Sequence, residues 1–469
     1  MRARLICLLV CGLAGCALAP APARDDIRRE ALPNVAVPEQ WSAAGNPPRA
    51  VAHDWLASFG DPQLEALVTE ALAFNADLAA AAGRVETAAG YLKASGATLY
   101  PQVNLVARGG GKMGGDASGL QGVGFFATWE LDLWGRVRAG QAASRLQYEA
   151  SQLDYEYARQ SIAAMVAKGW FLATEARMQK AQAQAMQRFA EQLGALEADR
   201  LRVGRGDEYD LAIARAGIET YRDSEVSFDL AYQQAIRALE TLAGRYPSAS
   251  LEVPDRLDTL RTEVPVGLPS ELLERRPDVV AAERRVASAF YQTEEAKAAR
   301  LPRISLTATI TSLSSELFVL QNPSSITGSI GAGLLQPIFL GGQLQAQVDV
   351  RTAEQRIAIA EYGRVSARAF SEVENALSSG FSLAQREEIL TRGLRENARA
   401  VDLANVRVNV GSGDLRGVRQ QQLAMYAAQV ALLRVQSERL VQRVNLYLAL
   451  GGSFDLPLSP LAGDDPSRR

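Results

Sequence analysis

Residues able to carry out catalysis are scarce in this sequence of 469 residues. His53 is the only histidine, and all three cysteines lie within the first sixteen positions. The sequence has no HExxH motif, no cluster of cysteine and histidine and no P-loop glycine pattern, so it lacks the spacings of common zinc and nucleotide sites. We interpret the glycine run 109–111 as a turn and His53 as a surface or packing residue. We therefore expect neither an enzyme nor a bound metal or cofactor.

The most suggestive polar residues follow two similar glycine turns. Asp207 and Asp210 follow the first turn, and Asp414 follows the second. Carboxylates repeated around a narrow opening attract cations and repel anions, whereas an aspartate at a helix start caps the helix. Both interpretations stay open for Asp207 and Asp414. The turn residues, which we expect to be docking points for a partner protein, are Gly204, Arg205, Gly206, Gly411, Ser412 and Gly413.

The N-terminus has the pattern of a secretion signal. Arg2 and Arg4 precede an apolar run at 5–10, and the sequence Leu-Ala-Gly-Cys ends at Cys16. This ending resembles a bacterial lipobox, which implies cleavage after residue 15 and acylation of Cys16. Ala17 in the next position then points to the outer membrane, where acyl chains anchor a protein without spanning the bilayer. The alternative is an ordinary signal peptide with a chance cysteine.

The charge distribution argues against a nucleic-acid partner. The chain has 50 Lys and Arg against 53 Asp and Glu, a net charge of −3 and a pI near 5.7, and its basic residues are dispersed among acidic ones. After residue 16 no run of about 18 apolar residues occurs, so we predict no transmembrane helix. Any crossing of a membrane must then be made by strands.

The chain contains an internal repeat. Residues 75–105 return 201 positions later as residues 276–306, with Asp77 matching Asp278 and Pro101 matching Pro302 without a gap. Such a duplication usually builds a symmetric assembly rather than one asymmetric catalytic cleft.

Each repeat contains a stretch of alternating apolar and polar residues. The pattern holds in 123–133, in 304–311 and in 326–334, and it predicts strands of about 9–12 residues with one apolar face. These strands form two hairpins, near 101–134 and 303–340. Their length, and Tyr100, Trp129 and Trp134 near their ends, favour a bilayer-spanning barrel with an aromatic girdle over a sandwich.

Helices occupy most of the remaining chain. Residues 63–98 are strong helix formers, and the segments 135–203 and 342–410 contain no proline and end at the two glycine turns. The helices that return from these turns carry apolar stripes with spacings of three and four, which indicates coiled-coil packing rather than an ordinary bundle core. The proline-rich segment 17–60 is expected to be extended.

Four strands are too few to close a membrane barrel. Edge strands would leave N–H and C=O groups unpaired in hydrocarbon, at a cost of several kcal/mol each. We therefore expect the chain to oligomerise, and two, three or four copies would all satisfy this argument.

Four spaced motifs resemble those of the outer-membrane efflux protein family, the relatives of TolC. They are DWLASFGDPQL at 54–64, WELDLWGR at 129–136, RRPDVVAAE at 275–283 and QPIFLGG at 336–342. Together with the lipobox they make the chain most similar to the NodT/OprM-type lipoprotein branch, and the match covers nearly the whole mature chain.

The resemblance implies a fold and a set of partners. The fold is mainly α with membrane β: a trimer whose twelve-stranded β-barrel is continued by a periplasmic α-helical barrel. The implied function is the exit duct of a tripartite efflux pump for drugs or other small toxic compounds. Its partners would be a periplasmic adaptor and an inner-membrane transporter, often of the RND class. Alternatives are the outer-membrane component of a protein-secretion system and a structural coiled-coil lipoprotein, which would need no membrane-length hairpins.

The chain departs from the family at one position of interest. Similar proteins have an aspartate about nine residues after the second tip glycine, whereas this sequence has Arg419 and Gln420 there. We therefore expect Arg419 and Gln420 to line a less cation-selective opening.

The expected organisation has five parts. Residues 1–15 are the signal peptide, 16–61 the anchor and extended segment, 62–260 the first repeat, 261–455 the second repeat and 456–469 a disordered tail.

Overall fold

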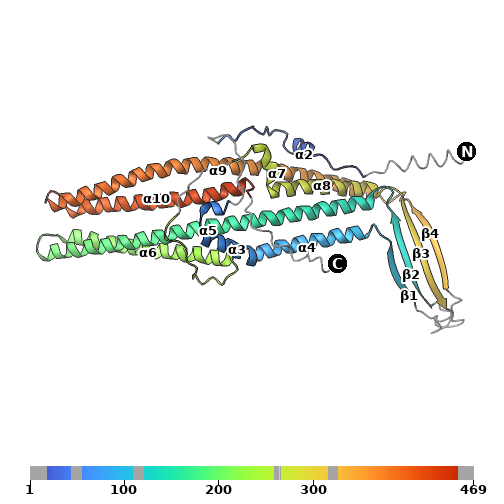
Figure 1. Ribbon diagram of the computed structural model, residues 1–469, viewed down its shortest axis with the longest axis horizontal. Coiled ribbons are helices and arrows are strands. Elements are labelled where there is room, and N and C mark those ends of the chain that lie inside the picture. The colour runs from blue at the N-terminus through green and yellow to red at the C-terminus, as the bar shows by residue number, and fades with distance from the viewer. Residues whose placement is uncertain are drawn as a thin grey trace. The chain divides into compact units, whose positions relative to one another are not determined.

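A computed structural model describes residues 18–43, 55–108, 121–257, 264, 266–314 and 326–452. The predicted signal peptide, Cys16, His53, the glycine run 109–111 and the predicted tail 456–469 lie outside these residues. The protein is mostly helical (72%). Figure 1 shows the long helices and one group of neighbouring strands.

The chain folds into two compact units, each drawing on both repeats. The strand unit comprises Met1–Val35, Gly83–Asp154 and Asp278–Ser366, and the helical unit comprises Ala36–Ala82, Tyr155–Pro277 and Ala367–Arg469. Neither repeat therefore folds as a separate body.

The strand unit contains one antiparallel sheet with the order β1-β2-β3-β4. Its strands lie within the two predicted hairpins, near 101–134 and 303–340. β1 and β4 are the edges. The strands are β1 (Gln102–Arg108), β2 (Gln121–Leu131), β3 (Arg303–Ser314) and β4 (Ile326–Leu335).

The register of the sheet separates an apolar face from a polar one. Residues opposite each other in an antiparallel ladder share a face. Apolar side chains on this sheet are exposed to an unusual degree, since Ile330 is 89% and Leu105 is 64% exposed. One apolar row runs Val103, Ala127, Ala308, Ile330, and the adjacent polar row runs Gln102, Thr128, Thr307, Gly331.

The proline-free segments form two very long helices, as predicted. α5 (Arg136–Arg202) and α9 (Gln343–Asn409) have 67 residues each, and the returning helices α6 (Glu208–Leu242) and α10 (Leu415–Ala449) have 35 each. Polar pairs cross between outgoing and returning helices: Gln184 donates to Glu225 at 2.7 Å, and Gln436 to Glu387 at 3.2 Å. Among the described helices, none is long and apolar enough to cross a lipid bilayer.

The core of the helical unit forms around the motif at 54–64. Trp55 stacks on Tyr447 with ring centroids 5.8 Å apart. Asp61 caps α3 (Pro62–Phe74) by accepting two backbone N–H groups of its first turn, and it also accepts the indole N–H of Trp170 at 2.8 Å. The motif therefore joins a helix start to the aromatic core.

Asn75 corrects the prediction of one helix through 63–98. The helix is interrupted at this residue, which separates α3 from α4 (Ala76–Ala97). The side chain of Asn75 accepts the N–H of Leu78 at 3.1 Å and donates to the carbonyl of Leu242 at 3.0 Å. A short polar side chain that bonds the backbone in this way competes with helix continuation, so helix-forming composition alone did not reveal the break.

The second repeat makes the same contact with a different residue. Arg276, 201 positions after Asn75, lies between α7 (Leu272–Arg275) and α8 (Pro277–Ala298) and donates to the carbonyl of Ala449 at 3.2 Å. Leu242 and Ala449 are the last residues of α6 and α10. The duplication is thus preserved in the contact although the residue types differ.

The segment expected to be extended contains short helices. α2 (Arg24–Ala31) buries Ile27, and Arg24 pairs with Glu283 at 2.8 Å within the strand unit. Acidic residues in its first turn and arginines in its last turn complement the helix dipole. The same segment contains a 3₁₀ turn at Ala57–Phe59, and a second 3₁₀ turn, at Pro269–Glu271, lies in the second repeat.

Glu240 organises the loop that follows α6. Its buried carboxylate accepts backbone N–H groups from Ala249 and Ser250, each at 2.7 Å, and from Leu251 at 3.0 Å. Burial disfavours the charged form, but these donors outweigh it and lower the pKa of Glu240 below its ordinary value of 4.5.

We predict that Glu240→Gln destabilises the protein by about 2 kcal/mol, because the amide presents a donor to buried N–H groups. The measurement is the urea midpoint at neutral pH. A group whose pKa is lowered by folding stabilises above its unfolded pKa, and this stability is lost as the pH falls through the lowered value. The difference between wild type and variant should therefore shrink in acid. Glu219→Gln, at a side chain that is 66% exposed, is the control, and equal midpoints for the two variants would contradict the prediction.

Candidate functional site

The two helix-hairpin tips of the helical unit form the same turn. Gly204 and Gly411 adopt φ of 71° and 75°, the left-handed conformation that favours glycine after a helix. The next residue closes each turn: the N–H of Arg205 donates to Arg200 O at 2.8 Å, and that of Ser412 to Arg407 O at 2.9 Å. The predicted docking residues are thus placed at two equivalent tips, and Arg205 and Ser412 are exposed.

Asp207 and Asp414 are helix N-caps. The carboxylate of Asp207 accepts the N–H of Asp210 at 2.8 Å, and that of Asp414 accepts the N–H of Gly417 at 2.9 Å. Of the two interpretations left open by the sequence, this geometry favours the helix-start one. A role in a ring of carboxylates stays a prediction for both residues.

Asp210 connects the two tips. Its carboxylate accepts two hydrogen bonds from Arg416, at 2.5 Å from Nε and 2.9 Å from Nη2. The same guanidinium lies 3.5 Å from Asp207 and 5.7 Å from the ring centroid of Tyr209. The start of α6 and the start of α10 are therefore joined by a bidentate ion pair, the strong geometry for arginine and carboxylate.

This pairing determines the electrostatics of the tip. The hydrogen bond from Arg416 is the main cause that lowers the pKa of Asp210, and the charges of Arg419 and Arg200 add to it. Asp210 thus remains ionised, but its charge is balanced by neighbouring arginines. It does not present an isolated negative charge.

The predicted residues Arg419 and Gln420 lie on the second turn of α10. Gln420 is exposed, Arg419 is half-buried and Val418 between Gly417 and Arg419 is buried. Arg419 is three residues after Arg416, so the two arginines project from neighbouring positions on one helix face. The structure brings Arg419 near Asp210 and leaves its role in an opening as a prediction.

Arg416 was not singled out from the sequence. A usable signal was present, because a cation in the first turn of a helix is unfavourable with respect to the dipole and needs a carboxylate partner. The partner, however, comes from a helix 206 residues earlier, which sequence spacing does not reveal.

Aromatic side chains also connect the two hairpins, farther along α6 and α10 from the tips. Tyr221 of α6 meets Tyr426 of α10 edge to face, with ring centroids 5.6 Å apart. Tyr221 is buried together with Met186 and Ala190 of α5. Within the described part of the chain, no group of three or more His, Cys, Asp or Glu could hold a metal ion.

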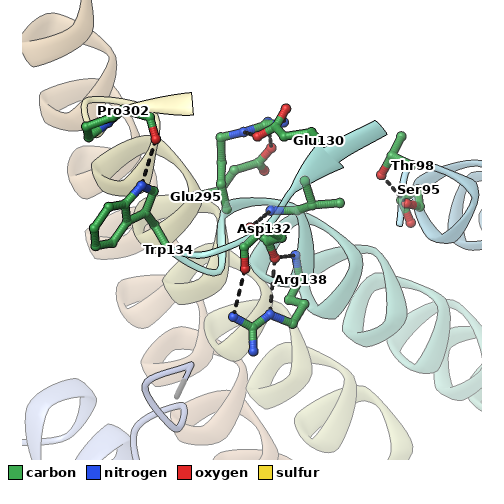
Figure 2. Close-up of polar contacts among 10 residues, drawn as sticks. Ser95, Thr98, Glu130, Asp132, Trp134, Arg138, Glu295 and Pro302 are labelled. Atoms are coloured by element: carbon green, nitrogen blue, oxygen red, sulfur yellow. Dashed lines mark hydrogen bonds and ion pairs between the residues drawn. The ribbon is translucent and has the colours of Figure 1, made fainter. Parts of the chain in front are cut away.

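A second cluster of charged residues lies at the junction between β2 and α5 in the strand unit. Figure 2 shows Asp132 facing Arg138 at the start of the helix. Asp132 accepts the N–H groups of Val137 at 3.1 Å and Arg138 at 2.9 Å. Arg136 donates twice to Glu130 and lies 3.7 Å from Glu295 of α8. These charged hydrogen bonds tie the end of β2 to the start of α5.

The tryptophans at the strand ends are tied to the backbone. The indole N–H of Trp134 donates to Pro302 O at 2.7 Å, and that of Trp129 to Leu99 O at 2.9 Å (Figure 2 shows the first). Trp134 is 44% and Trp129 is 36% exposed. An apolar body with a satisfied polar tip suits the boundary between lipid and water.

Comparisons with known proteins agree with the resemblance seen in the motifs. The family model described as "Outer membrane efflux protein" matches residues 67–245 and 268–452, so it matches once in each repeat. The chain is 30% identical over 478 residues to the pyoverdine export outer membrane protein OpmQ of Pseudomonas aeruginosa, covering 98% of both chains. It is 30% identical over 454 residues to the cation efflux system protein CusC of Escherichia coli K12, covering 94% of this chain and 97% of that protein.

A solved structure gives the same result. The open state of the MtrE outer membrane channel of Neisseria gonorrhoeae superposes with a TM-score of 0.82 at 29% identity, covering 93% of this chain and 97% of that chain. The family model spans most of both repeats, and the sheet and tips described above lie within the segments it matches. The chain therefore belongs to the outer membrane efflux protein family and is an outer-membrane channel of the TolC-like type.

Proposed function

We propose that three copies of this chain close into one duct, with a twelve-stranded β-barrel in the outer membrane and a periplasmic barrel of helices. The observation that carries the proposal is the four-stranded sheet with one apolar face, one polar face and two open edges. The number three comes from the family, whose members form trimers.

The open edges make a single copy unsuited to lipid. Backbone N–H and C=O groups on the outer sides of β1 and β4 have no ladder partner in the sheet. In hydrocarbon each such group costs several kcal/mol. Pairing β4 of one copy with β1 of the next satisfies both edges together.

The strand directions allow this closure for successive copies. Neighbouring strands alternate in direction, so β4 runs opposite to β1. The pairing of β4 with the next β1 is then antiparallel like all the others, and no strand has to reverse.

The polar face would line the duct. Its central rows contain hydroxyl side chains, among them Thr128, Thr307 and Thr309. Neutral hydroxyls form no charge barrier, so this part would admit cargo of either sign. Selection by charge would fall to the tips, where Asp210, Arg416 and Arg419 lie together.

We infer the partners from the family and the anchor from the lipobox-like sequence that ends at Cys16. The channel would receive cargo from an inner-membrane transporter, of the RND class, through a periplasmic adaptor that docks at the exposed glycine tips. Acylation of Cys16 would tether the chain to the outer membrane, with the long helices extending into the periplasm. Transport through this chain would be passive, its energy coming from the transporter.

Small compounds are the best-supported cargo. The relatives named above are described as exporters of pyoverdine and of cations, which are both small but chemically different. Similar channels thus export chemically different cargo, which fits a wide polar lumen that does not select the compound it transports.

The mass of the detergent-extracted protein tests the proposal. We expect three copies by light scattering, and planar bilayers containing this species should conduct ions. A single copy as the stable form, or a trimer without conductance, would contradict it.

We predict that Asp210→Asn raises conductance severalfold, because losing the ion pair with Arg416 frees the two tips to separate. The charge-exchanged double variant Asp210→Arg, Arg416→Asp should return conductance toward wild type. Arg202→Ala, which breaks the exposed pair with Asp199 on the same tip, is the matched control. Wild-type conductance in Asp210→Asn would exclude the pair as a restraint.

The pair should also resist mild acid. Because the pKa of Asp210 is lowered from 3.8, the carboxylate stays charged above that value and the pair is lost only as the pH falls through the lowered pKa. Wild-type conductance should therefore be unchanged between about pH 7 and about pH 5.

We predict that Arg419→Asp increases the preference for cations, because each copy would exchange a positive for a negative charge at the opening. The measurement is the reversal potential in a salt gradient. Arg222→Asp, on an exposed part of α6 beyond the tip, is the control. An unchanged ion preference in Arg419→Asp would count against a pore-lining position.

A further inference from the structure

The two repeats build their strand-to-helix junctions from different chemistry. The first junction, residues 130–138, joins β2 to α5, and the second junction, residues 337–345, joins β4 to α9. They are equivalent because α5 and α9 have equal length and begin 207 positions apart, at Arg136 and Gln343. Gly135 and Gly342, which precede them, share a positive φ of 75° and 85°.

The charged groups of the first junction are absent from the second. Glu130, Asp132, Arg136 and Arg138 form its ion pairs and its helix cap. The equivalent positions of the second junction are Pro337, Phe339, Gln343 and Gln345. None of these can form an ion pair.

Apolar side chains of the second junction are exposed instead. Ile338 is 88% exposed, Phe339 is 85% and Leu340 is 50%. Three consecutive exposed apolar residues are unusual outside an interface, so this surface requires an occupant.

The first junction shows where that occupant should lie. The end of β2 is next to the start of β3, and across this seam Trp134 donates to Pro302 and Arg136 approaches Glu295. The end of β4 pairs with the start of β3 on one side, where Leu335 lies opposite Arg303, but its outer side has no neighbouring strand because β4 is an edge. Its missing neighbour should be the start of a strand equivalent to β3.

That equivalent strand is β1, the other edge. Pro302 and Glu295 lie 201 positions after Pro101 and Ala94, in the stretch where the two repeats align without a gap. Pro101 directly precedes β1 and follows Tyr100, which is 70% exposed, whereas Ala94 lies near the end of α4. Since β4 and β1 of successive copies run antiparallel, the end of one lies beside the start of the other.

We propose that the second junction of one copy packs against residues 94–101 of the next copy, with Ile338 and Phe339 covering Tyr100. The inference rests on the multi-copy barrel proposed above and identifies the contact that joins the copies where strands pass into helices. A second copy of this chain is the occupant, because the repeat already makes the equivalent contact once within each chain.

The contact between β2 and β3 within a chain and the proposed contact between β4 and β1 of successive copies differ in chemistry. Within a chain the seam is ionic, with Arg136 facing Glu295. Between copies the equivalent positions are Gln343 and Ala94, which carry no charge and leave room for the apolar residues. Apolar burial that occurs only on assembly favours association of copies.

A pair of cysteines tests the contact. Tyr100→Cys and Phe339→Cys are introduced together, in a protein whose natural cysteines all lie in the first sixteen positions. Oxidation, or a short bis-maleimide linker, should give bands of two and three copies on a denaturing gel. Phe339→Cys with Tyr246→Cys, whose tyrosine is 85% exposed but lies in the helical unit, should remain a single copy.

The outcomes separate this inference from the proposed function. No cross-link in a sample whose detergent mass shows three copies would overturn the contact and leave the duct intact. A single-copy mass would overturn the duct itself.

A charge in the apolar contact provides a second test. Phe339→Asp should lower the stability of the assembled form, so that the detergent concentration or heat needed to dissociate it falls well below that of Tyr246→Asp. If Phe339 faced lipid instead, Phe339→Trp would be quenched by brominated phospholipid as strongly as Ile330→Trp on the apolar face of the sheet. That equality would overturn the inference, and quenching several times weaker would support it.

Discussion

The unpaired backbone at the two edges of the sheet is the constraint on which the rest of this structure depends. The sheet has an apolar face suited to lipid and a polar face suited to a lumen. Lipid offers no partner for the open N–H and C=O groups of β1 and β4. The proposed assembly, its seams and its duct all follow from the need to satisfy these groups.

Duplication allows one architecture to be used twice with different chemistry. Asn75 and Arg276 reach the ends of α6 and α10 through equivalent contacts, and the glycine turns at both tips are alike. The strand-to-helix junctions differ, because one is charged and internal and the other is apolar and exposed. The two junctions share a backbone conformation but have different side chains. One junction can therefore make its contacts within the chain, while the other remains exposed for contact with a second copy.

The two hairpin tips share one type of glycine turn and are connected by one ion pair. Asp207 and Asp414 are needed to start α6 and α10, so their carboxylates already have a structural role. Asp210 has no capping role, and Arg416 holds it across the two hairpins. A charge that belongs to an ion pair restrains movement more than it attracts ions.

The sequence by itself determined the elements of this protein. Alternation in 123–133 revealed a two-faced strand, the absence of proline in 135–203 allowed one helix, and spaced motifs identified the family. These signals are local, because they depend on residues a few positions apart. Only the tertiary structure decided the break at Asn75, the pairing of Arg416 with Asp210 and the difference between the two junctions. Each of these depends on partners more than a hundred residues away. The local spacing of apolar and polar residues does not reveal which distant group a side chain contacts.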